Sequence, residues 1–329
     1  MKVVSNIFWN VAQNRFRSGW RLVIQFILFL MILVGVALFG KAIGPGASSA
    51  IIDALIYLGC GLGLAWLMAR YIDHRPLANF GFHLNRSWWA DLGFGLALGA
   101  GIMTGIFLSL RAAGWVSVTG TAVTNYNLPF ALAFIIKVFE WTVIGINEEV
   151  TFRGYQMKNL AEGLAGKRAS PQGAIVLAMM LSSSVFGLAH LINDSATGLS
   201  TFNIAIGGLL LGIPYLLTGE LAISIGCHIT LNLFEGTVYG FAVSGSSQAT
   251  HLLSLQQTGP ALWTGGAFGP EAGLIATVWI LVGCCLTVLW IKWRRKQVQL
   301  YTPLAMYTST TSKELFGADP GRHRAIDLE

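Results

Sequence analysis

The sequence predicts an all-α membrane protein, a polytopic transmembrane bundle of about eight helical spans. Hydrophobic residues make up 54% of the 329 residues and charged residues only 11%, whereas soluble domains carry roughly 25% charged residues. The mean hydropathy is +0.63. Apolar runs of about 20 residues, the length that crosses the hydrocarbon core of a bilayer, recur along the chain.

Eight apolar runs lie between polar or Gly/Pro-rich breaks, and each is predicted to be a membrane-spanning helix. They cover residues 23–39, 49–68, 92–110, 128–146, 174–191, 202–217, 221–243 and 272–291. The first run follows the basic residues Arg15, Arg17 and Arg21, as the core of a signal peptide would. Because it is longer than such a core usually is, we expect it to remain as an uncleaved helix.

These runs predict three parts of the chain. Residues 1–22 form a basic N-terminal segment, residues 23–291 the bundle, with its polar motifs within about 128–243, and residues 292–329 a polar tail. The stretch 244–269 is rich in Gly, Ser, Thr and Gln and has no Lys or Arg, which indicates a long external loop. The end of the tail, residues 302–329, is expected to lie outside the fold.

The distribution of Lys and Arg predicts the orientation. Both chain ends and the second and fourth connections are basic, whereas the first, third, fifth and seventh connections contain only Lys41 and Arg111. Both termini are therefore expected in the cytoplasm and the protein in a bacterial plasma membrane. The net charge of +6 comes largely from these flanking clusters, which suit anionic lipid headgroups. No nucleic-acid module is recognisable, so no nucleic-acid partner is expected.

Three polar motifs interrupt consecutive apolar segments. They are Glu148-Glu149-x-x-x-Arg153, Phe186-x-x-x-His190 and His228-x-x-x-Asn232. An ionisable side chain at the centre of a membrane helix costs roughly 2.5–3.5 kcal/mol on insertion scales and persists mainly where it has a function. Together the three motifs are predicted to form one active site.

The first motif offers two carboxylates with different surroundings. Neighbouring helical residues point about 100° apart, and Arg153 lies four residues after Glu149, the favourable order for an ion pair. This pair leaves Glu148 free to act as a general base. Phe152, four residues after Glu148, is expected to form an apolar wall beside it. Taken alone, the motif is equally typical of a charge cluster at a helix end.

The second and third motifs add imidazole and carboxamide groups. His190 shares a helical face with Phe186, although a single His at a span end is more often hydrogen bonded than catalytic. His228 and Asn232 point to one side of the seventh span and could donate to a developing oxyanion. Hydrogen bonding between helices, worth about 0.6 kcal/mol per contact, is the alternative. Glu235 continues this face about 10 Å from His228 and is a weaker candidate.

At these residues the sequence resembles the CAAX prenyl protease and bacteriocin-processing family, called CPBP or Abi, whose eukaryotic branch is the type II CAAX prenyl endopeptidase. The ordered motifs E-E-x-x-x-R, F-x-x-x-H and H-x-x-x-[NB] of that family are all present, within about residues 141–234. The resemblance implies a metal-independent intramembrane glutamic endopeptidase without a cofactor. Its substrate would be a membrane-associated peptide, either prenylated or bacteriocin-like.

The resemblance also implies roles for single residues. Glu148 would activate a water molecule, His190 would help to hold that water, and His228 with Asn232 would stabilise the oxyanion. The neighbouring Glu–Arg pair and the two phenylalanines of the motifs would support this site.

Two other classes remain open. Two His and one Glu are also the ligands of a catalytic zinc site, although no H-E-x-x-H motif is present. A non-catalytic immunity or scaffold protein, or a transporter that uses its intramembrane charges, would also need such residues. Lys137 and Glu140, three residues apart in the fourth span, are expected to pair with each other in a structural or supporting role.

The depth of the site is a difficulty for a bundle of straight helices. Glu148 ends a span that runs inward, whereas His190 ends a span that runs outward. The two groups can meet if the fourth helix continues past Arg153, or if residues 167–173 belong to a tilted or broken fifth element.

Overall fold

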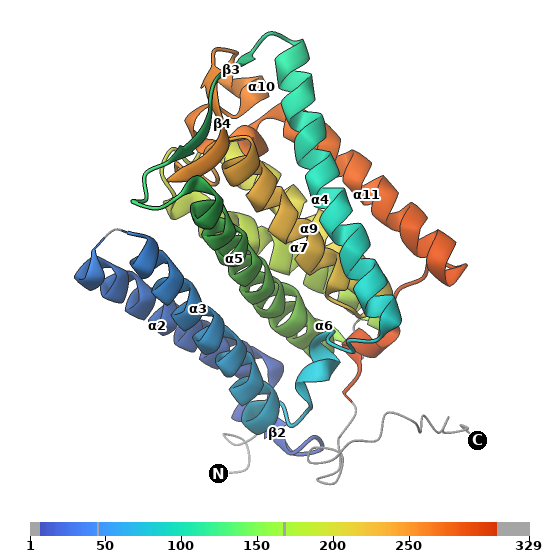
Figure 1. Ribbon diagram of the computed structural model, residues 1–329. Coiled ribbons are helices and arrows are strands. Elements are labelled where there is room, and N and C mark those ends of the chain that lie inside the picture. The colour runs from blue at the N-terminus through green and yellow to red at the C-terminus, as the bar shows by residue number, and fades with distance from the viewer. Residues whose placement is uncertain (1–6, 45, 167–168, 308–329) are drawn as a thin grey trace.

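The computed structural model describes residues 7–44, 46–166 and 169–307 of the chain. Figure 1 shows a bundle of long helices, with α2 and α3 as a pair along one side and a small sheet at one end. Seven helices within the described residues are long and apolar enough to cross a membrane. The predicted helical membrane bundle is therefore confirmed.

The long helices are α2 (Ser18–Ile43), α3 (Ala47–Leu67), α4 (Arg86–Ala112), α5 (Phe130–Glu149), α7 (Pro171–Ala189), α8 (Gly198–Thr218) and α11 (Leu274–Arg295). The short ones are α6 (Lys158–Leu164), α9 (Ala222–Asn232) and α10 (Ala261–Thr264). Segments of π-helix are η1 (Met68–Ile72), η3 (Val150–Met157) and η5 (Leu233–Val238), and 3-10 turns are η2 (Leu77–Phe80), η4 (His190–Ile192), η6 (Gly266–Phe268), η7 (Pro270–Ala272) and η8 (Thr302–Ala305).

The seventh predicted span differs from the others. It is the 11-residue helix α9 followed by η5, and it contacts α4, α5 and α8 inside the bundle. Glycines allow α4 to approach it closely: a Cβ at Gly95 would lie 2.4 Å from the carbonyl oxygen of Ile223, and one at Gly99 would lie 2.3 Å from that of Cys227. Small residues at such crossings favour tight packing between membrane helices. The eight predicted spans thus correspond, within the described residues, to seven long helices and the short helix α9 inside the bundle.

The fourth predicted span is longer than expected. Helix α5, the π-helix η3 and helix α6 form one continuous helical segment, Phe130–Leu164, of 35 residues. Every residue of η3 is buried. The helix therefore continues past Arg153, which is the first of the two solutions that the sequence left open.

A two-stranded antiparallel sheet lies at one end of the bundle (Figure 1). It pairs β3 (Val116–Thr124) with β4 (Thr250–Gln257), and a second small sheet pairs β1 (Trp9–Asn10) with β2 (Arg15–Phe16). The expectation that 244–269 is only a loop is wrong in this respect. The Val and Thr residues of β3 are the sequence feature that indicates a strand, because β-branched residues favour strands. A hydropathy analysis alone does not detect this feature.

Both ends of the described chain meet at α6. Six charged residues with buried side chains, called here the end cluster, connect them; they are Arg15, Arg21, Asp73, Arg75, Lys158 and Glu162. The backbone oxygen of Pro303 accepts a hydrogen bond from Lys158 at 3.4 Å, and Leu304 and Ala305 in η8 are buried. The expectation that the fold ends before residue 302 is therefore wrong for η8, while residues 308–329 lie outside the described part.

The end cluster also corrects the interpretation of the basic flanks. The guanidinium groups of Arg15, Arg21 and Arg75 are at most 2% exposed in these ion pairs, so they are not available to lipid headgroups. Both ends of the described chain nevertheless lie at the same end of the bundle, as a shared cytoplasmic location would require. The orientation in a membrane itself remains a prediction.

Candidate active site

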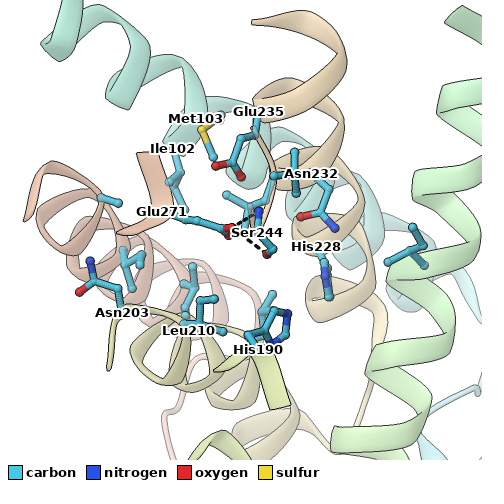
Figure 2. Close-up of a pocket in the computed structure, with 18 of the residues that line it drawn as sticks. Ile102, Met103, His190, Asn203, Leu210, His228, Asn232, Glu235, Ser244 and Glu271 are labelled. Carbon is cyan, nitrogen blue, oxygen red and sulfur yellow. Dashed lines mark hydrogen bonds between the residues drawn. The ribbon is translucent and has the colours of Figure 1, made fainter. Parts of the chain in front are cut away.

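A cavity of about 400 Å³ collects side chains from all three motifs. Glu148 from α5, His190 from η4, and His228 with Asn232 from α9 line it. Figure 2 shows His190 and His228 approaching the cavity from different helices, with Asn232 above His228. The structure therefore brings together the four residues that the sequence proposed as catalytic.

The long helical segment explains how Glu148 and His190 meet. At 1.5 Å per residue, Glu148 lies about 24 Å from the Leu164 end of its segment, and His190 lies about 28 Å from Pro171 at the start of α7. The segments are joined by the short connection after α6 and run in opposite directions. The two side chains therefore reach similar levels in the bundle.

Glu149 is completely buried and has two partners. Its Oε1 atom accepts a hydrogen bond from Arg153 Nη1 at 2.8 Å, the ion pair expected from their spacing. The same oxygen lies 2.7 Å from His228 Nδ1. Arg153 also donates to the backbone oxygen of Gly208 in α8 at 3.2 Å. Glu149 thus orients the histidine of the third motif, a contact that no sequence pattern indicates.

Glu148 is the more accessible carboxylate of the pair. Its side chain is 22% exposed, and its Oε2 atom lies 3.7 Å from His228 Nε2. Glu148 also lines a second cavity of about 470 Å³ between α5 and the α2–α3 pair. The expected Lys137–Glu140 ion pair, at 2.7 Å, lies in the wall of this second cavity.

The two histidines have different hydrogen-bond partners. His190 Nδ1 lies 2.8 Å from the backbone oxygen of Phe186; because a carbonyl only accepts, Nδ1 carries the proton and Nε2 is an acceptor in the neutral ring. His228 Nδ1 faces the Glu149 carboxylate instead. This carboxylate can stabilise a positive charge on the His228 ring, which makes its Nε2 a potential donor.

Phe186 is the packing centre of the site. Its ring lies 4.9 Å from the ring of His190 and 5.1 Å from that of Phe152, and the Arg153 guanidinium lies 4.5 Å above it. Phe186 is one of the apolar residues that line the cavity with Glu148, whereas Phe152 packs edge-on against Phe186 and does not line it. The turn to π-helix after Glu149 changes the i, i+4 geometry on which the expected Glu148–Phe152 contact was based.

Two π-helical segments follow the motif residues directly. Helix α5 changes to η3 after Glu149, and helix α9 changes to η5 after Asn232. Such wider turns are rare in α-helices and occur frequently at functional sites. They break the regular helical spacing where the motif side chains turn towards the cavity.

Three further polar residues of this cavity were missed or given little weight. Glu235 was a weaker candidate, and Ser244 and Glu271 were not considered, although all three line the cavity with the motif residues. Glu271 is the only Asp, Glu, Lys or Arg among residues 244–273, which is a signal that the sequence did offer. Within the described residues, no three His, Cys, Asp or Glu side chains form a metal-binding group. The absence of a metal requirement remains a prediction.

Together, the seven long apolar helices define an integral membrane protein in which the three polar motifs line one cavity. Residues 129–234 match a family model, described as Type II CAAX prenyl endopeptidase Rce1-like. This match confirms the family resemblance of the three motifs over about a third of the chain. No curated protein and no solved structure matches the chain.

Proposed function

We propose that the protein is an intramembrane endopeptidase that hydrolyses a peptide bond of a membrane-associated substrate, prenylated or bacteriocin-like, with water activated by Glu148. The observation that carries this proposal is the single cavity into which the three family motifs converge. A partly exposed carboxylate, an imidazole and a carboxamide in one cavity are groups that can carry out the general-base hydrolysis of a peptide.

In this proposal the water molecule lies between Glu148 and His190. The unprotonated Nε2 of His190 accepts a hydrogen bond from the water, and Glu148 takes its proton as the oxygen attacks the scissile carbonyl carbon. His228 Nε2–H and the Asn232 amide donate to the oxygen that becomes negatively charged. Glu148 then returns the proton to the leaving nitrogen as the carbon–nitrogen bond breaks.

The different partners of the two histidines support this division of roles. A carbonyl partner leaves His190 as an acceptor, and the carboxylate of Glu149 supports His228 as a donor. Glu149 and Arg153 are positioning residues in this scheme because they act through His228. A membrane-enclosed cavity also excludes bulk water, which strengthens hydrogen bonds to a developing charge.

The test is cleavage by the purified full-length protein in liposomes, measured by mass spectrometry of the products. Two peptides of the same sequence, one farnesylated on a C-terminal CAAX cysteine and one unmodified, separate a prenyl requirement from general peptidase activity. We expect cleavage by the wild type to survive a strong chelator, because Glu148 and not a metal activates the water. Glu148→Gln protein is the control for contaminating peptidases. Activity that the chelator abolishes and zinc restores would favour a zinc peptidase, and intact peptides throughout would favour a non-catalytic role.

A further inference from the structure

Two carboxylates of the cavity have no role in the proposed chemistry. Glu235 lies in η5, just after the last motif, and Glu271 lies in η7, just before α11. Both line the same cavity as Glu148, His190 and His228. They also lie outside residues 129–234, the segment that matches the family model. They therefore lie in a part of the cavity that the family match does not cover.

Glu235 is a buried acidic group with an unused acceptor. Glu235 is only 1% exposed, and among the described residues its Oε1 atom has no hydrogen-bond partner. Gly269 closes over this carboxylate with a φ of +121°; a Cβ there would lie 2.3 Å from the backbone oxygen of Ala242 and 3.1 Å from Glu235 Oε1. The chain thus encloses Glu235 with backbone, yet provides no donor to its Oε1 atom.

Glu271 is held in place as a hydrogen-bond acceptor. Its Oε1 atom accepts from the backbone nitrogen of Ser244 at 2.5 Å and from the Ser244 hydroxyl at 2.7 Å (Figure 2). These two donors fix the position of the Glu271 carboxyl group in the wall of the cavity, beside the proposed catalytic groups.

Acidic groups outnumber basic groups in the wall of the cavity. Among the described residues that line it there are three glutamates and two histidines, but no lysine or arginine. Even with His228 protonated, as the proposed mechanism requires, the glutamates exceed the cationic groups. Ionised carboxylates in a buried site are unfavourable unless a cation pairs with them. The Glu149 charge, in contrast, is already neutralised by Arg153. The carboxylates that line the cavity are therefore complementary to a positively charged ligand group.

We propose that Glu235 and Glu271 form a specificity subsite that binds a basic side chain, Lys or Arg, of the peptide substrate. This inference rests on the proposed function. Glu235 lies about 10 Å beyond His228 along the axis of α9 and η5, which corresponds to about three residues of extended peptide. The subsite therefore selects peptides with a basic residue about three positions from the scissile bond.

The experiment measures cation binding without turnover, on the purified full-length protein carrying Glu148→Gln. Hexylammonium is the probe, and 1-hexanol is the uncharged control that partitions into the detergent and fills apolar space in the same way. We expect hexylammonium to raise the thermal unfolding temperature saturably and hexanol to do so much less. Glu235→Gln/Glu271→Gln should weaken the apparent affinity about tenfold or more, because both charged partners are lost. Glu220→Gln, which removes one negative charge elsewhere, should leave it unchanged.

Three outcomes would overturn the subsite: equal stabilisation by hexanol and hexylammonium, no binding of hexylammonium, or unchanged affinity in the double variant. If the double variant does not fold, the single variants Glu235→Gln and Glu271→Gln provide the same comparison, and unchanged affinity in both rejects the proposal. The two proposals can fail separately. Peptide cleavage that needs Glu148 without cation binding rejects only the subsite, and cation binding without any cleavage rejects only the peptidase.

Discussion

The end cluster and the cavity contain similar side chains but differ in how their charges are compensated. In the end cluster, Glu162 accepts two hydrogen bonds from Arg75, at 2.6 and 2.8 Å, and a third from Arg15 at 2.9 Å. In the cavity, Glu148 is partly exposed, and its nearest charged partner is His228 and not a Lys or Arg. Cations exceed anions in the first group, whereas carboxylates without a Lys or Arg line the second.

This comparison shows that burial of charge does not by itself identify a functional site. An ionisable residue within a membrane segment is a functional candidate by default, and Lys158 and Glu162 satisfy that criterion as well as Glu148 does. Their partners enclose them in closed ion pairs that connect the two chain ends. What distinguishes Glu148 is an open cavity in front of a carboxylate that is not neutralised. The variants below test this distinction, in order of expected effect.

The largest effect is expected for Glu148→Gln. This change keeps the size of the side chain but removes the proton acceptor, so kcat should fall by about 10² to 10⁴, equivalent to about 2.7–5.5 kcal/mol. The unfolding temperature should stay the same or rise, because an unneutralised charge is removed from a partly buried site. Peptide cleavage on amounts of protein matched for folding measures the first quantity, and thermal unfolding measures the second. Wild-type activity in this variant would reject the assignment of Glu148 as the base.

Glu162→Gln should show the opposite pattern. Removal of one partner leaves the buried guanidinium groups uncompensated, which typically costs about 3–5 kcal/mol of stability. The activity of the protein that remains folded should be close to that of the wild type, because Glu162 does not line the cavity. Denaturant unfolding in micelles gives the stability, with Glu220→Gln as a control for loss of a less buried carboxylate. A large loss of kcat without loss of stability would mean that the end cluster contributes to catalysis and not only to stability.

Asn232→Ala tests the proposed oxyanion site and should have a smaller effect on activity. Loss of one donor to a developing oxyanion usually lowers kcat by about 10² to 10³. His228→Ala should lower kcat by a similar factor. The double variant should lose less transition-state stabilisation than the two single variants together, because both groups serve one oxygen. The measurement is kcat and KM for the three variants with the same peptide. Fully additive losses would indicate that His228 and Asn232 act in different steps.

The smallest effect is expected outside both clusters, at His83. A hydrogen bond with Glu220, at 2.7 Å, raises the pKa of His83 above its usual value. A raised pKa in the folded state means that the stabilisation is fully present below the unfolded pKa, near 6.5, and is lost as the pH rises through the folded pKa. Because the His83 side chain is 46% exposed, solvent screens the pair, and its contribution should be less than about 1 kcal/mol.

The corresponding measurement compares the unfolding free energies of wild type and His83→Gln at pH 6 and pH 8.5. The difference between the two proteins should be larger at pH 6, where His83 is protonated. A larger difference at pH 8.5 would contradict the direction of the pKa shift. Either result leaves the comparison of the end cluster with the cavity unchanged, because His83 belongs to neither.

The sequence alone determined the properties that depend on neighbouring residues. Hydropathy over about 20 residues predicts helices, and the i, i+4 spacing predicts the Glu149–Arg153 ion pair, because one helix provides both positions. The ordered motifs also carried the family resemblance and named four of the residues that line the cavity. The β3–β4 pairing was partly visible in the Val and Thr residues of β3, but its partner strand lies more than 120 residues later in the sequence.

Only the tertiary structure decided which of the buried charges face each other and which face a cavity. The contact between Glu149 and His228 spans 79 residues, and Glu271 reaches the site from beyond the last motif. Arg15 and Arg21 resemble ordinary basic flanks in the sequence, yet they are buried against Asp73 and Glu162. The physical reason is that the state of a charged side chain depends on its solvation and on partners within a few ångströms. Those partners are brought together by helix packing, which local sequence patterns do not encode.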